Sequence, residues 1–182
     1  MTIERRSNGP TEITKPAFIV ADLPEPVATW IAATRARFEP SIAHLPAEIT
    51  LAGSSGVGVV RKGQRIEDIG VTLEATLGDL LPFEARLTGV DSFPGTDIYF
   101  AVPEQAPFAR VHVALAKSGI AFAPSAYPYR AHCSLKGRTP LGTGEREALT
   151  RLVVPAMAFT IRTVSVYQMA RLQADRVWSI TA

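Results

Sequence analysis

The sequence has very little cysteine and no long apolar segment, and each shortage excludes a class of structure. Cys133 is the single cysteine among 182 residues, so neither an intrachain disulfide nor a metal cage of several cysteines can form. The apolar stretch 17–21 is far too short to cross a bilayer, and the N-terminal residues lack the apolar run of a signal peptide. We therefore expect a soluble, cytoplasmic protein without a membrane partner, with residues 1–14 as a flexible tail.

The chain also has little excess charge of either sign. Its 19 lysine and arginine residues against 17 aspartate and glutamate residues leave a formal net charge of +2. A value so near zero gives no electrostatic reason to expect duplex DNA as a partner. Hydrophobic residues make up 47% and charged residues 20%, which is typical of a globular protein. We expect a single domain over residues 15–182, with a monomer as the favoured oligomeric state.

Hydrophobic spacing, together with the positions of proline and glycine, predicts an alternation of strands and helices. In the helix expected to end before Pro40, Arg35, Arg37 and Glu39 are assigned to the outward face. One strand–helix unit is used twice, and long strands with few crossovers predict an α+β fold of mainly antiparallel sheets with helices on one face. The expected strands are 17–21, 47–52, 83–90, 96–102, 129–136, 158–169 and 177–181, and the expected helices are 24–38, 65–81, 103–118 and 145–153.

The most informative feature is an expected strand, 129–136, whose two faces differ. Side chains alternate between the faces of a strand, so Ala131, Cys133 and Leu135 share one apolar face that suits the core. The opposite face is too polar and too cationic to be buried without a purpose. That face consists of Arg130, His132, Ser134 and Lys136.

A second expected strand, 47–52, repeats this arrangement with Glu48 and Thr50. In each strand an ionisable residue is followed two positions later by a hydroxyl, on the same face and roughly 7 Å away. A histidine with a pKa of about 6.5 exchanges protons at neutral pH, and a hydroxyl can donate a hydrogen bond to a phosphate oxygen. If the two strands face each other, Glu48, Thr50, His132 and Ser134 form a site suited to a phosphodiester.

These strands resemble the paired His-x-Thr/Ser motifs of the 2H phosphoesterase superfamily, which includes bacterial 2′-5′ RNA ligases and RNA 2′,3′-cyclic phosphodiesterases. Residues 132–135 (HCSL) match the second motif. Residues 45–53 (LPAEITLAG) match the surroundings of the first, with Glu48 where the family has histidine. Similar stretches are also found at 17–24, 83–93 and 165–178, so the resemblance covers nearly the whole chain from about Lys15.

The resemblance implies two pseudo-symmetric lobes of mainly antiparallel sheet, with helices packed outside and a central cleft. It also implies metal-independent acid–base chemistry on a nucleotide or RNA-end phosphodiester, without a cofactor. One catalytic group deprotonates the attacking water or hydroxyl, and the other protonates the leaving oxygen. Carried over to this chain, the candidates are His132 and Glu48 for catalysis and Thr50 and Ser134 for phosphate binding. From their residue types and positions alone, Arg130 and Lys136 are further candidates for phosphate binding, and Tyr129 and Tyr167 for contact with a base or phosphate.

The glutamate in the first motif leaves more than one interpretation open. A carboxylate with an unperturbed pKa of about 4.3 can act as a general base at neutral pH, with His132 as the acid. Alternatively, because a carboxylate is a poor acid and repels phosphate, the chain is a catalytically impaired protein that only binds a nucleotide or RNA end. A third interpretation is a structural protein whose polar strand faces are covered by another chain. His44 lies upstream and could replace the missing histidine, although Pro46 intervenes.

Overall fold

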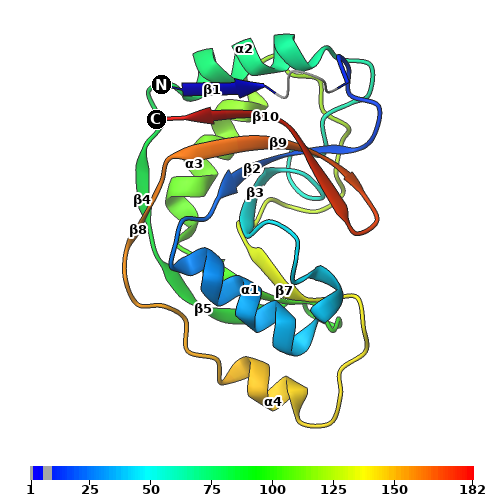
Figure 1. Cartoon of the computed structure of the whole chain (residues 1–182), viewed down its shortest axis with the longest axis vertical. Coiled ribbons are helices and arrows are strands. Elements are labelled where there is room, and N and C mark those ends of the chain that lie inside the picture. The colour runs from blue at the N-terminus through cyan, green and yellow to red at the C-terminus, as the bar shows by residue number, and fades with distance from the viewer. Residues whose placement is uncertain (1, 6–9) are drawn as a thin grey trace.

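The computed structural model describes residues 2–5 and 10–182, which form two lobes stacked along the long axis of the molecule (Figure 1). The upper lobe in that view is built on a five-stranded sheet of order β1-β10-β9-β2-β3. All four of its strand pairs are antiparallel. The strands are β1 (Thr2–Arg5), β2 (Ala17–Asp22), β3 (Glu48–Ala52), β9 (Thr163–Ala170) and β10 (Gln173–Thr181).

The lower lobe contains a three-stranded antiparallel sheet of order β5-β6-β7, and a two-stranded ribbon, β4-β8, runs between the lobes (Figure 1). With the helices placed outside these sheets, the predicted α+β class with antiparallel pairing is confirmed. The bounds are β4 (Phe83–Ala85), β5 (Leu87–Ser92), β6 (Tyr99–Pro103), β7 (Cys133–Lys136) and β8 (Phe159–Ile161).

Two helices, α1 and α3, each follow a strand of one lobe in sequence but pack against the sheet of the other lobe, and this packing connects the two lobes. Helix α1 follows β2 of the upper sheet but packs on β7 of the lower one, whereas α3 follows β6 and packs on β3. Each strand that carries a sequence motif is therefore supported by a helix that begins in the other lobe. The bounds are α1 (Val27–Phe38), a short 3₁₀ turn η1 (Pro40–Ile42), α2 (Ile66–Leu77), α3 (Gln105–Ala116) and α4 (Glu145–Thr150).

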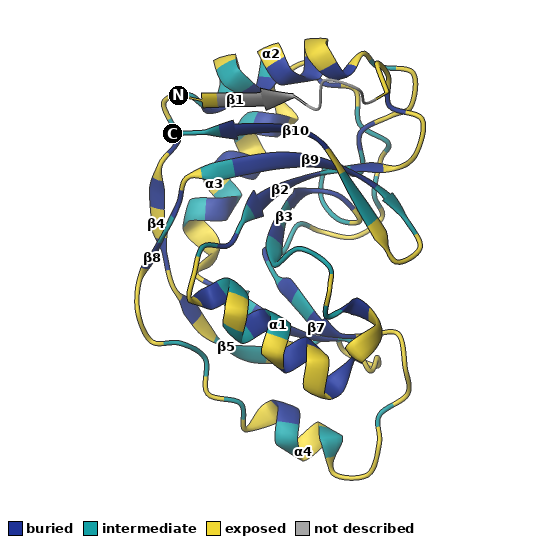
Figure 2. Ribbon diagram, viewed as in Figure 1, coloured by how far each residue is buried: buried dark blue, intermediate teal, exposed yellow. Residues whose placement is uncertain are grey.

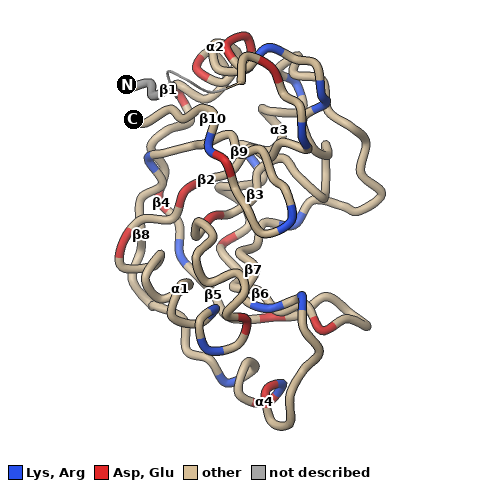
Figure 3. The backbone as a smooth tube through the Cα atoms, turned by 45° about the vertical axis from the view of Figure 1, so that its right-hand side comes forward, with Lys and Arg blue, Asp and Glu red and all other residues tan. Residues whose placement is uncertain are grey.

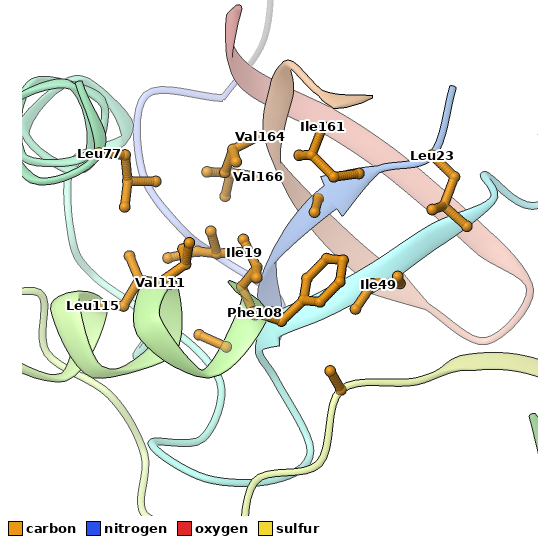
Figure 4. Close-up of a cluster of buried hydrophobic side chains, with 14 of the residues drawn as sticks. Ile19, Leu23, Ile49, Leu77, Phe108, Val111, Leu115, Ile161, Val164 and Val166 are labelled. Atoms are coloured by element: carbon orange, nitrogen blue, oxygen red, sulfur yellow. The ribbon is translucent and has the colours of Figure 1, made fainter. Parts of the chain in front are cut away.

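The main core fills the space between the five-stranded sheet and the helices α2 and α3 (Figure 4). Ile19 and Val164 contribute from the sheet, and Phe108 and Leu115 contribute from α3, all of them buried. The dark strands and inner helix faces in Figure 2 follow this layer, while the outer helix faces are exposed. Burial of these large apolar side chains is the main force that holds the lobes together, at roughly 25 cal/mol for each Å² removed from water.

Gly70 lies in the middle of α2, where a glycine lowers helix propensity. Here its missing side chain permits a close approach, because a Cβ at this position would lie 2.2 Å from the indole ring of Trp178. Trp178 is 6% exposed and packs within the main core. The local cost of the glycine is therefore offset by helix–sheet packing.

The first residues of the chain are packed onto the domain where the structure describes them. Thr2–Arg5 pairs with β10 as an added edge strand, and Ile13 is 1% exposed in the main core. The backbone of Ile13 is fixed by hydrogen bonds with Gln64 and Gly63. Residues 1 and 6–9 of the expected tail lie outside the described residues.

The strand expected over 129–136 is shorter in the structure, because β7 begins only at Cys133. The partner strand β6 ends at Pro103. Beyond that point the side-chain amide of Gln105, in place of a strand backbone, makes the hydrogen bonds to Ala131. Gln105 Nε2 donates to the Ala131 carbonyl at 3.0 Å, and Gln105 Oε1 accepts from the Ala131 amide at 2.9 Å. The alternation of faces nevertheless persists, since Ala131, Cys133 and Leu135 are all fully buried.

Two side chains that the sequence analysis places outward on the first helix are instead buried. Arg35 is 3% exposed and Glu39 is fully buried, whereas Arg37 is exposed as expected. Both are buried because this helix, α1, packs on β7 of the lower lobe. Its buried stripe is therefore wider than the apolar residues alone indicate.

Replacing Glu39 with glutamine is expected to destabilise the fold by about 2–3 kcal/mol at neutral pH. Burial alone raises the pKa of Glu39, but amide donors from Arg138 and Thr139 and the hydroxyl of Ser41 outweigh it and lower the pKa to about 2. Because the pKa of Glu39 is lower in the folded protein than in the unfolded chain, this contribution to stability is fully present above the ordinary glutamate pKa of 4.5. It is lost as pH falls through about 2. Urea unfolding from pH 7 to 2 measures it, with the exposed Glu147→Gln as control. An equal loss in both variants would contradict the prediction.

Charged residues of both signs are distributed over the whole described chain (Figure 3). This mixture agrees with the small formal net charge of +2. Within the described residues, no helix combines the length and apolar character needed to span a membrane.

Candidate active site

A cleft of about 390 Å³ lies between the two motif-bearing strands. Strands β2, β3 and β9 form one wall, and β7 with the residues on either side of it forms the other. Glu48 and Thr50 border the cleft from β3, while His132 and Ser134 border it from the opposite wall. The four polar residues of the two motifs thus lie around a single cleft.

The imidazole of His132 is held in one orientation. Its Nδ1 lies 2.8 Å from the Arg130 carbonyl, and because a carbonyl can only accept, Nδ1 carries the hydrogen. The rings of Phe93 and Phe100 pack against it edge-on, each with its centroid 5.2 Å away. In the neutral ring, Nε2 is therefore the proton acceptor. Burial lowers the pKa of His132 although the Arg130 carbonyl opposes the shift, so the neutral form prevails at pH 7.

Glu48 has a protonation state that the sequence analysis does not anticipate. Burial, the largest effect, raises the pKa of Glu48 to about 7, against the lowering influence of the Arg35 charge and of the Thr50 hydrogen bond. Thr50 Oγ1 donates to Glu48 Oε2 at 3.3 Å, and the nearby Asp22 raises the pKa further. Near neutral pH, a large share of the molecules therefore has a protonated Glu48. The environment gives this carboxyl the ability to donate a proton, which its unperturbed pKa denies it.

The two cations predicted to bind phosphate have other partners. Arg130 does not border the cleft; its guanidinium pairs with Asp91 at 2.7 Å and lies over the Phe100 ring. Lys136 borders the cleft but is 1% exposed, and its ammonium donates to the Phe38 carbonyl at 3.1 Å and to Thr139 Oγ1 at 2.7 Å. It also pairs with Glu145 at 3.4 Å. Both cations therefore hold together parts of the lower lobe.

The two tyrosines considered as ligand contacts differ in position. Tyr129 donates its hydroxyl to the Thr50 carbonyl at 3.1 Å and stacks on His112, with ring centroids 3.8 Å apart. It is not among the residues that border the cleft. Tyr167 on β9 does border it, so only this tyrosine is placed to meet a ligand there. His44 is exposed, its Nε2 lies 2.9 Å from the Leu172 carbonyl, and it is not among the residues that border the cleft.

A comparison with protein families finds one that accounts for most of the chain. The sequence model of the 2′-5′ RNA ligase superfamily matches residues 23–173. The chain belongs to this superfamily. The resemblance inferred from the two motifs is thereby confirmed at the level of the family. Among curated proteins, none matches the sequence.

Several solved structures share the fold of this superfamily member. TT0787 of Thermus thermophilus is 18% identical, with a TM-score of 0.62, and the match covers 91% of this chain and 97% of that one. E. coli LigT in complex with 3′-AMP is 16% identical, with a TM-score of 0.57 and coverage of 90% and 94%. E. coli LigT in complex with NADP⁺ is 15% identical, with a TM-score of 0.57 and coverage of 92% and 97%.

This superfamily member has a further site residue that the sequence analysis missed. Arg35 borders the cleft and connects its two walls. Its Nε donates to the Ser134 carbonyl at 2.9 Å, and its Nη1 donates to the carbonyls of Leu45 and Pro46 at 3.0 Å each. Its spacing from Ile31 and Phe38, four and three residues away, would have placed it on the buried stripe of the helix. The residue type masked this signal, because arginine is almost never fully buried unless it is paired.

Arg138 is a second cation at the cleft that sequence reasoning did not select. It is exposed, borders the cleft from the loop after β7, and donates through Nη2 to the Arg171 carbonyl at 3.2 Å. Its backbone amide is fixed by Glu39. Among the described residues, no group of three or more histidine, cysteine, aspartate or glutamate residues is arranged to hold a metal ion.

Proposed function

We propose that this protein is a phosphoesterase that acts on a nucleotide or RNA-end phosphodiester, with a 2′,3′-cyclic phosphate as the simplest substrate. The observation that carries the proposal is a complementary pair in one cleft. His132 is neutral with Nε2 free to accept a proton, and Glu48 is a carboxyl that retains its proton near neutral pH. The pair supplies a general base and a general acid without a metal or cofactor.

The proposed hydrolysis uses each group once. Nε2 of His132 removes a proton from water as the water oxygen bonds to phosphorus. One ring P–O bond breaks, and the carboxyl of Glu48 gives its proton to the departing ribose oxygen. The hydroxyls of Thr50 and Ser134 donate hydrogen bonds to the non-bridging oxygens. Proton exchange with solvent then restores both groups. These roles reverse the assignment of Glu48 as base and His132 as acid made from unperturbed pKa values.

Known complexes of a similar fold support a nucleotide as the ligand. LigT structures contain 3′-AMP, NADP⁺, ATP or phosphate, and their TM-scores to this chain lie between 0.54 and 0.57. A small nucleotide fits the size of the present cleft, and the exposed Arg138 offers a positive charge at its rim. We propose that the protein works as a hydrolase in the processing of RNA ends or nucleotides.

The test is turnover of a panel of 2′,3′-cyclic nucleotides and 2′-5′-linked dinucleotides by the wild type, Glu48→Gln and Glu48→His. Glutamine removes the acid and is expected to lower kcat by roughly 10²-fold or more. Histidine restores a group that can donate a proton and is expected to retain activity. Because the pKa of Glu48 is about 7, wild-type activity should fall as pH rises above that value. Glu84→Gln, on an exposed position of β4, is the matched control.

Binding without turnover would instead favour the impaired binding protein. That outcome requires ligand-dependent thermal stabilisation of the wild type with no product from the whole panel. If Glu48→His then gained turnover, the carboxyl at position 48 would be identified as the cause of the lost activity.

A further inference from the structure

Asp22 is the cross-strand neighbour of Glu48. The register of β2 and β3 places the two residues directly opposite each other. Directly opposite residues of an antiparallel pair point to the same face, with Cβ atoms about 4.5–5.5 Å apart. The same register places Val20 opposite Thr50, and both of these border the cleft. Asp22 and Glu48 are therefore cross-strand neighbours on the face of the sheet that forms the cleft wall.

One oxygen of Asp22 is well satisfied and the other is not. Oδ2 accepts a hydrogen bond of 2.6 Å from the hydroxyl of Ser165 on β9, a fully buried residue. Oδ1 is shielded from solvent and has no hydrogen-bond donor. A buried acceptor without a donor costs about 1–3 kcal/mol. If Asp22 and Glu48 were both ionised, neither could donate a hydrogen bond to the other, because a carboxylate only accepts. A proton held between the two carboxyls would provide the missing donor.

We propose that Asp22 is a positioning residue that shares one proton with Glu48, so that the carboxyl of Glu48 faces the cleft as a proton donor. This inference rests on the proposed function for its catalytic meaning, and on geometry alone for the pairing itself. It explains how a glutamate can stand where the family has a histidine. A coupled carboxyl pair both donates and accepts a proton near neutral pH, as an imidazole does.

The charged and titratable groups around Glu48 shift its pKa in both directions. Glu48 is faced by Arg35 from α1, which lowers its pKa, while burial, the largest effect, and the charge of Asp22 raise it. The Tyr129 hydroxyl and the Cys133 thiol also lie within its electrostatic reach, and the pKa of each is raised chiefly by burial. The guanidinium of Arg35 is engaged with three backbone carbonyls, so its position is fixed while the proton moves.

Asp22 has its own set of neighbours on the upper sheet. Burial raises the pKa of Asp22, while the Ser165 hydroxyl and the charge of Arg176 on β10 lower it. Tyr167 on β9 lies near both carboxyls, and burial raises the pKa of its phenol. The hydrogen bond from Ser165 and the charge of Arg176 both favour the ionised form of Asp22, so in the proposed pair Asp22 carries the negative charge and Glu48 the proton. Removing the charge of Asp22 should make Glu48 easier to ionise.

The test follows the titration of Glu48 by NMR of protein labelled with ¹³C at the glutamate carboxyls, without substrate, in the full chain. Glu48→Gln identifies the signal. In the wild type the midpoint is expected near the pKa of about 7. In Asp22→Asn it should fall by about one pH unit, because the neighbouring negative charge is lost. In Ser165→Ala it should also fall, because Asp22 then takes the proton more readily. Asp175→Asn, at an exposed ion pair, is the control and should leave the midpoint unchanged.

Each outcome decides the inference. An unchanged Glu48 midpoint in Asp22→Asn overturns it; if that variant does not fold, the midpoint of Ser165→Ala decides instead. A shifted midpoint in a protein that turns over no cyclic phosphate leaves the pairing standing and removes the proposed function. If the protein is active, the alkaline limb of its pH–rate profile should move to lower pH in Asp22→Asn. A purely structural role of Asp22 would lower activity at every pH without moving that limb.

Discussion

Replacing His132 with alanine is expected to lower the turnover of a 2′,3′-cyclic phosphate by roughly 10²- to 10⁴-fold, the usual contribution of a placed general base. The imidazole is already arranged for this role. Its Nδ1–H is committed to the Arg130 carbonyl, two aromatic rings fix its plane, and Nε2 remains the acceptor. No other histidine of the chain can replace it, since His112 is bonded to the Leu51 carbonyl and His44 to that of Leu172.

Kinetics at several pH values, together with thermal shift in the presence of nucleotide, measure this effect. His132→Ala should retain ligand-dependent stabilisation, because Thr50 and Ser134 still offer their hydroxyls. It should also lose the acidic limb of the pH–rate profile, which in the wild type reports protonation of the imidazole. His44→Ala, at an exposed position that does not border the cleft, is the control and should keep wild-type turnover. Undiminished activity in His132→Ala would remove this residue from the mechanism.

Replacing Arg35 with methionine is expected to destabilise the protein by about 3–5 kcal/mol, the largest effect on folding that we predict. Methionine keeps much of the length of the side chain but leaves the carbonyls of Ser134, Leu45 and Pro46 without their charged donor. Two of these carbonyls precede β3 and one lies in β7, so the loss falls where the two lobes meet.

Urea unfolding of Arg35→Met beside Arg37→Met separates this role from a general effect of removing positive charge. Arg37 lies on the same helix, is exposed, and stacks over Phe38 at 4.7 Å, so its replacement should cost about 0.5 kcal/mol or less. Arg35→Met should also retain less activity than its remaining folded fraction accounts for, because the relative position of Thr50 and Ser134 is no longer fixed. Equal stability of the two variants would show that Arg35 does not hold the lobes together.

The polar faces of the two motif strands could be predicted because alternation along a strand is a local property. Ala131, Cys133 and Leu135 face the core, and His132 and Ser134 face the cleft, even though the chain at 131–132 is paired by a side-chain amide. Peptide geometry imposes this alternation wherever the backbone is extended. The order and spacing of the two motifs were likewise sufficient to indicate the family.

The partners of the cations could not be predicted, because they come from segments far away in sequence. Lys136 and Arg130 have the spacing of phosphate ligands, yet one holds the end of α1 and the other pairs with Asp91. Arg35 carries the charge of a surface residue, yet it is buried at the junction of the lobes. Which side of a helix is covered depends on what packs against it, and here α1 contacts a strand that lies about a hundred residues further along the chain.

The sequence by itself therefore determined the family, the fold class, and the four residues around the cleft, since these follow from local alternation and from the spacing of two short motifs. Only the tertiary structure decided the chemistry available to Glu48. Its pKa of about 7 is the balance between burial and the charge of Asp22, which raise it, and the neighbouring Arg35 and Thr50, which lower it. Two of these three come from other elements, and the desolvation exists only once both lobes enclose the cleft. From the motif alone Glu48 would be a poor acid, but its surroundings in the folded protein keep it protonated to a large extent near neutral pH.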